Sequence, residues 1–150
     1  GPIGWQSFFP QVQIALHKYF ANTRALSDMV NATRQWIDLV LSHPKEVEHG
    51  LGDWMATDFL RVVISGHVFL IEALRAWSLL TDSEMERERS TKCAQEEVEQ
   101  FATRFISGNT GDVTYNGSHP TQSGQAMAIF HDLVPDSWKD LVTSRMLRVV

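Results

Sequence analysis

The sequence predicts an all-α fold built from repeated pairs of antiparallel helices. Apolar residues recur at spacings of three and four along most of the chain, which is the helical period. Strand-like alternation is missing, apart from a short extended piece at most at 112–115. Three glycine-containing loops, at 1–5, 50–54 and 108–117, each lead into a helical pattern. Since one helical hairpin separates each loop from the next, the chain is expected to contain three αα-hairpins.

The first hairpin is predicted to consist of helices at Phe8–Phe20 and Ala25–Ser42. Ser7 can cap the first helix, and Pro10 falls in its first turn, where a missing N–H costs little. Pro44 ends the second helix, because the residue before a proline avoids the helical conformation. One face of the first helix gathers its apolar side chains: Phe8, Val12, Ala15, Leu16 and Tyr19.

The second hairpin pairs an interior helix with a surface helix. The predicted helix at about Thr57–Leu80 is apolar on most of its sides, as in an interior helix. Thr81 and Glu84 have the spacing of a capping box at the start of the next helix, which is expected to run to about Ile106. That helix has a narrow apolar stripe and a broad charged face, so it is expected to lie on the interior helix.

The third hairpin is shorter. Its first helix is expected to begin at Ser118 or His119, with Pro120 in the first turn, and to run to about His131. Its second helix is expected to begin near Pro135 and to continue to the end, with apolar residues facing inward.

Together these elements predict one domain made of three hairpins, at about 5–43, 57–106 and 118–150. The linkers between hairpins are long and those within hairpins are short. If successive hairpins pack side by side, the long linkers emerge at the same end and form a rim. The first, third and fifth helices are the more apolar and are expected to line the inside. Their N-termini would then bring free N–H groups to this rim.

Composition narrows the classes of partner. The 150 residues carry a net charge of −5, which argues against binding to a nucleic-acid backbone. The longest apolar run, 68–71, is far too short to span a bilayer, so no membrane is expected, and no leader peptide is visible. Cys93 is the single cysteine, which excludes an internal disulfide but does not indicate a compartment.

Neither a metal nor a cofactor is expected. The six histidines include no H-x-x-x-H pair, and Cys93 has no second cysteine to join it as a ligand. No G-x-S-x-G motif is present for serine catalysis. His67, on the interior helix, fits a hydrogen-bonded core histidine better than a ligand. Asp112 is a weak candidate, because surface carboxylates are the default interpretation.

The sharpest candidates for a binding site are Trp5, Trp54 and the adjacent Asp53. A flat indole can stack on the apolar face of a sugar ring, and a neighbouring carboxylate can bind its hydroxyls. The alternative is that both tryptophans are packing anchors and that Asp53 is a helix-entry residue. His119 lies on the same predicted rim, where a capping role and a ligand contact both remain open.

The order of motifs resembles the α-L-rhamnosidases of glycoside hydrolase family 78. The similar segments keep their order and spacing over nearly the whole chain: Gly1-Pro-Ile-Gly-Trp5, Ala25–Val30, Arg34–Leu39, Gly52-Asp-Trp-Met-Ala56, Pro120–Phe130 and Leu133-Val-Pro135. The resemblance implies an (α/α)₆ toroid of six hairpins, of which this chain would be about half. It also implies rhamnose binding by tryptophans at the positions of Trp5 and Trp54, with Asp53 beside the second.

The resemblance further implies hydrolysis with inversion, in which one carboxylic acid protonates the leaving oxygen and one carboxylate activates water. The family's motifs for these two groups lie upstream of the Gly-Trp turn and downstream of the Leu-Val-Pro turn, and neither occurs here. The chain also departs from the family pattern after Trp5, where Gln6 stands in place of a frequent acidic residue, and at Ser123 and Gly124, which replace bulkier residues.

Two functions follow as expectations. The first is a segment of an α-L-rhamnosidase-like hydrolase that binds part of a sugar, with its catalytic groups outside the chain. The second is a non-catalytic scaffold or assembly subunit that retains half of the fold. In either case the inner helices of half a toroid would be exposed, so a partner chain or self-association is expected to cover them. A third interpretation is a helical-bundle binding module whose tryptophans all belong to the core.

Overall fold

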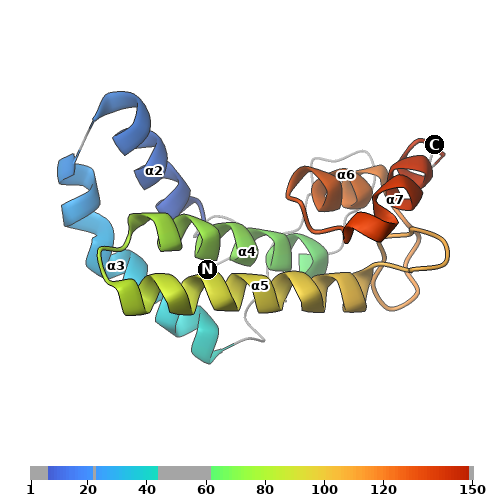
Figure 1. The fold of residues 1–150 in the computed structure, drawn as a ribbon, viewed down its shortest axis with the longest axis horizontal. Helices are drawn as coiled ribbons and strands as arrows, with labels where there is room; N and C mark the ends of the chain where they lie inside the picture. The colour runs from blue at the N-terminus through green and yellow to red at the C-terminus, as the bar shows by residue number, and fades with distance from the viewer. Residues whose placement is uncertain (1–6, 22, 44–61, 149–150) are drawn as a thin grey trace.

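The structure, a computed structural model, describes residues 7–21, 23–43 and 62–148, and within these ranges it contains helices and no named strand (Figure 1). The elements in chain order are α2 (Phe8–Phe20), α3 (Thr23–Ser42), α4 (Val62–Leu80), α5 (Glu84–Phe105), α6 (Gln122–Phe130), the short 3₁₀ helix η2 (Asp136–Trp138) and α7 (Lys139–Met146). Helices α2 and α3, α4 and α5, and α6 and α7 contact each other in pairs. The predicted all-α fold with three hairpins is therefore confirmed for the described residues.

Helix α4 is the centre of the arrangement, because it contacts α2, α3, α5 and α6. Figure 1 shows α4 and α5 side by side along the longest axis, with α2 and α3 at one end and α6 and α7 at the other. The inner row α2–α4–α6 corresponds to the first, third and fifth predicted helices. The predicted beginning of the third helix, at 57–61, lies outside the described residues.

The side chains of α4 are buried because most of them are apolar. Most of its side chains are enclosed, and the largest fully buried ones include Trp77, Ile71 and Leu74. By length and composition alone this helix could cross a membrane, but 61% of its apolar window is buried inside the protein. Such burial is the pattern of a core helix, in agreement with the interior position expected from the sequence.

Helix α5 lies on α4, as its narrow apolar stripe predicts. The rings of Phe101 and Phe105 pack at a tilt within the core, with centroids 5.0 Å apart. The charged face of α5 reaches α3 through two ion pairs, one of which joins Arg34 Nε to Glu86 Oε1 at 2.6 Å. The other joins Arg89 to Asp38 at 2.7 Å. The stripe thus holds α5 to the centre while its polar face connects two hairpins.

Two helix starts differ from the sequence-based expectation. The N-cap of α5 is Ser83, whose hydroxyl accepts a hydrogen bond from the Glu86 N–H, and not Thr81 paired with Glu84. Thr81 lies two residues before this cap, and its hydroxyl donates to the Glu86 carboxylate at 2.9 Å. Helix α6 begins at Gln122 because Thr121 caps it through the Gly124 N–H at 3.0 Å, so Pro120 precedes the helix. In both cases a hydroxyl placed three residues before a free N–H fixes the start.

Helix α2 buries a polar residue and exposes aromatic ones. Gln13 is fully buried and donates to the Thr33 hydroxyl of α3 at 2.7 Å. By contrast, about half the surface of Phe8 and Phe9 is exposed. The apolar face predicted from the sequence exists, but its members Phe8, Val12 and Tyr19 are each about half exposed or more.

Candidate functional site

The described part of the predicted rim is the linker 106–121, which joins α5 to α6. It leaves α5 as an extended segment and returns, so that Ile106 and Val113 form an isolated antiparallel bridge. The Thr114 N–H donates to the Phe105 carbonyl at 2.9 Å, and the Ser107 N–H donates to the Asp112 carbonyl at 3.0 Å. The short extended piece expected at 112–115 is therefore present, and it anchors the linker at the end of α5.

The first half of the linker packs on η2 and α7. Gly108 lies against the indole ring of Trp138, so closely that a Cβ there would be 2.8 Å from a ring carbon. Asp112 forms an ion pair with Arg145 of α7 and accepts a hydrogen bond from the Thr110 hydroxyl at 2.8 Å. Asp112 is thus a structural anchor in this loop, which agrees with its weak standing as a site candidate.

The second half of the linker forms a tight turn. The Tyr115 N–H donates to the Ser118 hydroxyl and the Ser118 N–H donates to the Tyr115 carbonyl, both at 3.0 Å. Asn116 and Gly117 have positive φ angles in this turn. His119 follows directly and is exposed, without a hydrogen bond or ion pair to any described residue. It does not cap α6, because Thr121 does so.

A polar cluster beneath this turn joins α4, α5 and the linker. His67 of α4 is only 7% exposed, and its Nδ1 lies 3.0 Å from Glu97 Oε2. Its Nε2 lies 3.2 Å from a terminal nitrogen of Arg104. Arg104 also donates to the Tyr115 hydroxyl at 3.2 Å. The expectation that His67 is a hydrogen-bonded core histidine is confirmed.

Sequence patterns do not single out Arg104, Glu97 or Tyr115. Arg104 is part of a helix with many charged residues, and Tyr115 is eleven positions away in a loop. No periodic pattern relates these two positions. The one sequence feature that points to this polar cluster is His67, because it is a polar residue on an apolar helix.

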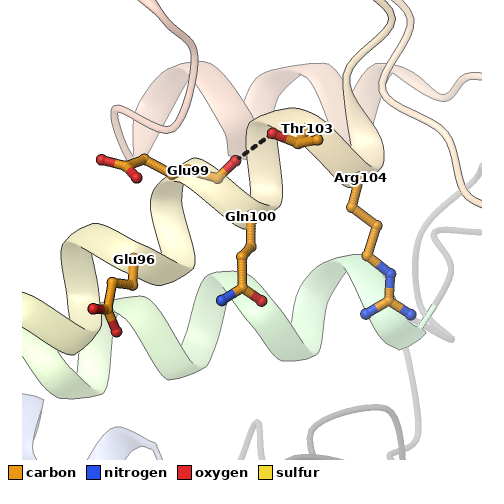
Figure 2. Close-up of a pocket in the computed structure, with 5 residues that line it drawn as sticks. All are labelled: Glu96, Glu99, Gln100, Thr103 and Arg104. Atoms are coloured by element: carbon orange, nitrogen blue, oxygen red, sulfur yellow. Dashed lines mark hydrogen bonds between the residues drawn. The ribbon is translucent and has the colours of Figure 1, made fainter.

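A groove of about 410 Å³ runs along the outer face of α5. Its described lining residues all come from that one helix and are all exposed: Glu96, Glu99, Gln100, Thr103 and Arg104. Figure 2 shows Gln100 and Arg104 projecting from the same side of α5, while the Thr103 hydroxyl turns back to the Glu99 carbonyl at 2.9 Å. None of the described lining residues is aromatic, so these side chains offer no stacking surface of the kind that sugar binding favours.

The pKa shifts among the described residues lie beyond the C-terminal end of α6, opposite the end that the linker 106–121 enters. There Lys139 contacts Asp132 at 2.9 Å and Asp136 at 2.8 Å. The hydrogen bond and charge of Lys139 lower the pKa of the Asp132 carboxyl, and the hydrogen bonds that Lys139 donates to Asp136 and Asp132 raise the pKa of its ammonium group. Asp132 and Asp136 lie in the short connection between α6 and α7, and Lys139 is the first residue of α7. No group of histidine, cysteine or acidic residues in the described ranges could hold a metal ion.

Three of the four predicted site residues, Trp5, Asp53 and Trp54, lie outside the described residues. Their joint placement at one rim therefore stays a prediction. The fourth, His119, lies on the linker that leads into the inner helix α6, as expected.

Comparison with known protein families decides where this fold belongs. The family described as the bacterial alpha-L-rhamnosidase 6 hairpin glycosidase domain matches residues 1–150. The chain belongs to this family. The resemblance that the motifs indicated is thus confirmed, as is the six-hairpin fold class, of which the described residues supply three hairpins.

A solved structure agrees with the family assignment. The Streptomyces avermitilis alpha-L-rhamnosidase, in complex with L-rhamnose, matches with a TM-score of 0.71 and 18% sequence identity. The match covers 89% of this rhamnosidase-family chain and 13% of the Streptomyces chain. The chain is thus similar in fold to a small part of a much longer enzyme. No curated protein matches it.

Proposed function

We propose that this chain is a segment of the catalytic domain of an inverting α-L-rhamnosidase-like glycoside hydrolase. In this proposal it supplies part of the wall of the sugar site, and both catalytic carboxylates are outside the chain. The observation that carries the proposal is the family match over residues 1–150. The Streptomyces neighbour, which binds L-rhamnose, supports a carbohydrate as the ligand class.

Each residue has a defined role in the proposal. Trp5 and Trp54 stack on the apolar faces of the sugar, and Asp53 accepts hydrogen bonds from its hydroxyls. His119 adds a hydrogen bond from the linker 106–121, for which its exposed imidazole is suited. Among the described carboxylates near this linker, Asp112 is paired with Arg145 and Glu97 is bonded to His67. Because both carboxylates already have partners, these contacts are consistent with catalytic carboxylates that lie outside the chain.

The test uses the purified chain, an aryl α-L-rhamnoside and L-rhamnose. We expect no hydrolysis above the uncatalysed background and weak L-rhamnose binding, measured by tryptophan fluorescence or NMR titration. His119→Ala should weaken this binding roughly two- to tenfold, as for one hydrogen bond. His43→Ala, which removes another exposed histidine, is the control and should leave binding unchanged. Robust hydrolysis that Asp53→Ala abolishes would contradict the placement of the catalytic groups outside the chain.

A second function, a scaffold or assembly subunit, is favoured by the exposed apolar side chains at both ends of the hairpin row. The most exposed described ones include Phe20 on α2, Phe130 on α6 and Leu147 after α7. Where such side chains form a contiguous patch, a partner or a second copy usually covers it.

Size-exclusion chromatography with light scattering tests whether the isolated chain associates through these side chains. We expect the isolated chain to self-associate at micromolar concentration, because its exposed aromatic residues can bury one another. Phe20→Ser together with Phe130→Ser should shift the population toward the monomer. A wild-type chain that stays monomeric and soluble at high concentration would count against the open face as an association surface.

A further inference from the structure

The hydrogen bonds of His67 define its protonation state. An arginine has five N–H donors and no acceptor, so a histidine nitrogen that bonds to it must carry a lone pair. Nε2 of His67 faces Arg104 at 3.2 Å and therefore accepts. Nδ1 faces the Glu97 carboxylate at 3.0 Å and therefore donates. Both bonds exist together only in the neutral imidazole with its proton on Nδ1.

We propose that His67 and Arg104 are positioning residues for the turn 115–118, and that this attachment requires a neutral His67. Arg104 connects the buried imidazole to the linker, because it donates to Tyr115 Oη at 3.2 Å. Its guanidinium also lies 5.1 Å from the centre of the Tyr115 ring and 5.2 Å from that of Phe105. Arg104 thus bridges His67 and Tyr115, the first residue of the turn.

Protonation of His67 changes these contacts in opposite ways. The bond to Glu97 is retained and becomes an ion pair. At Nε2, however, a new proton removes the acceptor and places two cations about 3 Å apart. Arg104 is then displaced, and Tyr115 loses a partner. Protonation of His67 is therefore expected to loosen the turn.

The charged groups around His67 support the expected effect of its protonation on Arg104. Glu97 and Arg104, both on α5, are the charged groups within bonding distance of its ring among the described residues. The described parts of α2, α3 and α6 place none there, and the linker contributes the Tyr115 hydroxyl through Arg104. The ring of Phe105, with its centre 5.2 Å from that of His67, fills another side.

Hydrogen exchange of the intact chain at pH 5 and pH 8 tests the proposal, with rates corrected for intrinsic pH dependence. We expect the protection of the Thr114, Tyr115 and Ser118 amides to fall about tenfold at pH 5, as for the loss of a charged hydrogen bond. The Ser107 and Gly111 amides, in the half of the linker held by the Asp112–Arg145 pair, should change far less.

Two variants separate positioning from general stability. His67→Gln offers an amide oxygen to Arg104 and an amide N–H to Glu97, so it should abolish the pH dependence and keep the turn protected. His119→Gln removes an exposed histidine and should keep the wild-type dependence. Arg104→Gln should leave the turn poorly protected at both pH values. A pH dependence that survives in folded His67→Gln would overturn the proposal.

A direct measurement does not depend on any variant folding. The imidazole nitrogen resonances of wild-type His67 at pH 8 should report a protonated Nδ1 and an unprotonated Nε2. A proton on Nε2 at that pH would show that Arg104 is not held by this ring. Neither experiment involves a sugar, so the outcome is independent of the proposed carbohydrate site.

Discussion

Replacing Phe101 with alanine is expected to lower the free energy of unfolding by about 3–5 kcal/mol. Phe101 of α5 is fully buried in a core cluster that draws residues from α4, α6 and α7 and includes Ile71, Phe105 and Leu133. Its removal takes away apolar burial and leaves a cavity that the helices around it can only partly close. Equilibrium urea unfolding followed by circular dichroism would measure the change.

Phe130→Ala is the matched control for this substitution. The same side chain is 83% exposed at the end of α6, so its loss should change the unfolding free energy by no more than about 0.5 kcal/mol. Equal losses for the two variants would contradict the assignment of the core to the contact between α4, α5 and α6.

Gly111→Ala is expected to be the second most damaging change, at about 2–5 kcal/mol, because two costs combine at this position. Gly111 has a φ of +72°, which costs a residue with a Cβ roughly 1–2 kcal/mol. The added Cβ would also lie 2.8 Å from the backbone oxygen of Leu141 in α7, and such overpacking typically adds about 1–3 kcal/mol. Because the obstacle is helix backbone, the linker and α7 would have to separate.

Gly117→Ala separates these two costs. Gly117 has nearly the same φ, +73°, but no atom lies within 4 Å of the added Cβ. Its substitution should therefore show only the conformational cost, about 1–2 kcal/mol by urea unfolding. If the Gly111 and Gly117 variants lost equal stability, the close packing of the linker on α7 would be wrong.

Helix positions are well predicted where periodicity and a breaking residue coincide. The helix Phe8–Phe20 has its predicted bounds, and the interior helix ends at Leu80 as expected. The starts of α5 and α6 are less well predicted, because several hydroxyl residues compete in each segment. Thr81 and Ser83 can both cap a helix, and only the packed structure decides between them, by directing Thr81 to the carboxylate of Glu86.

The candidate site is predictable to a smaller extent. The position of His119 after a glycine-containing loop places it on the linker, and the structure leaves it exposed there. The connection from Glu97 through His67 and Arg104 to Tyr115 is not predictable. It joins residues that are up to 48 positions apart by numbering (67 to 115), and neither helix periodicity nor motif spacing encodes such a pair.

By itself, the sequence determined the helical class, the pairing into hairpins and the family, because all three depend on local periodicity and on the order of short motifs. The tertiary structure alone decided which polar groups meet inside. Gln13 reaches Thr33, His67 reaches Glu97 and Arg104, and Asp112 reaches Arg145. The physical reason is that a polar group buried without a partner costs free energy, and the partner is selected by how the helices pack and not by distance along the chain.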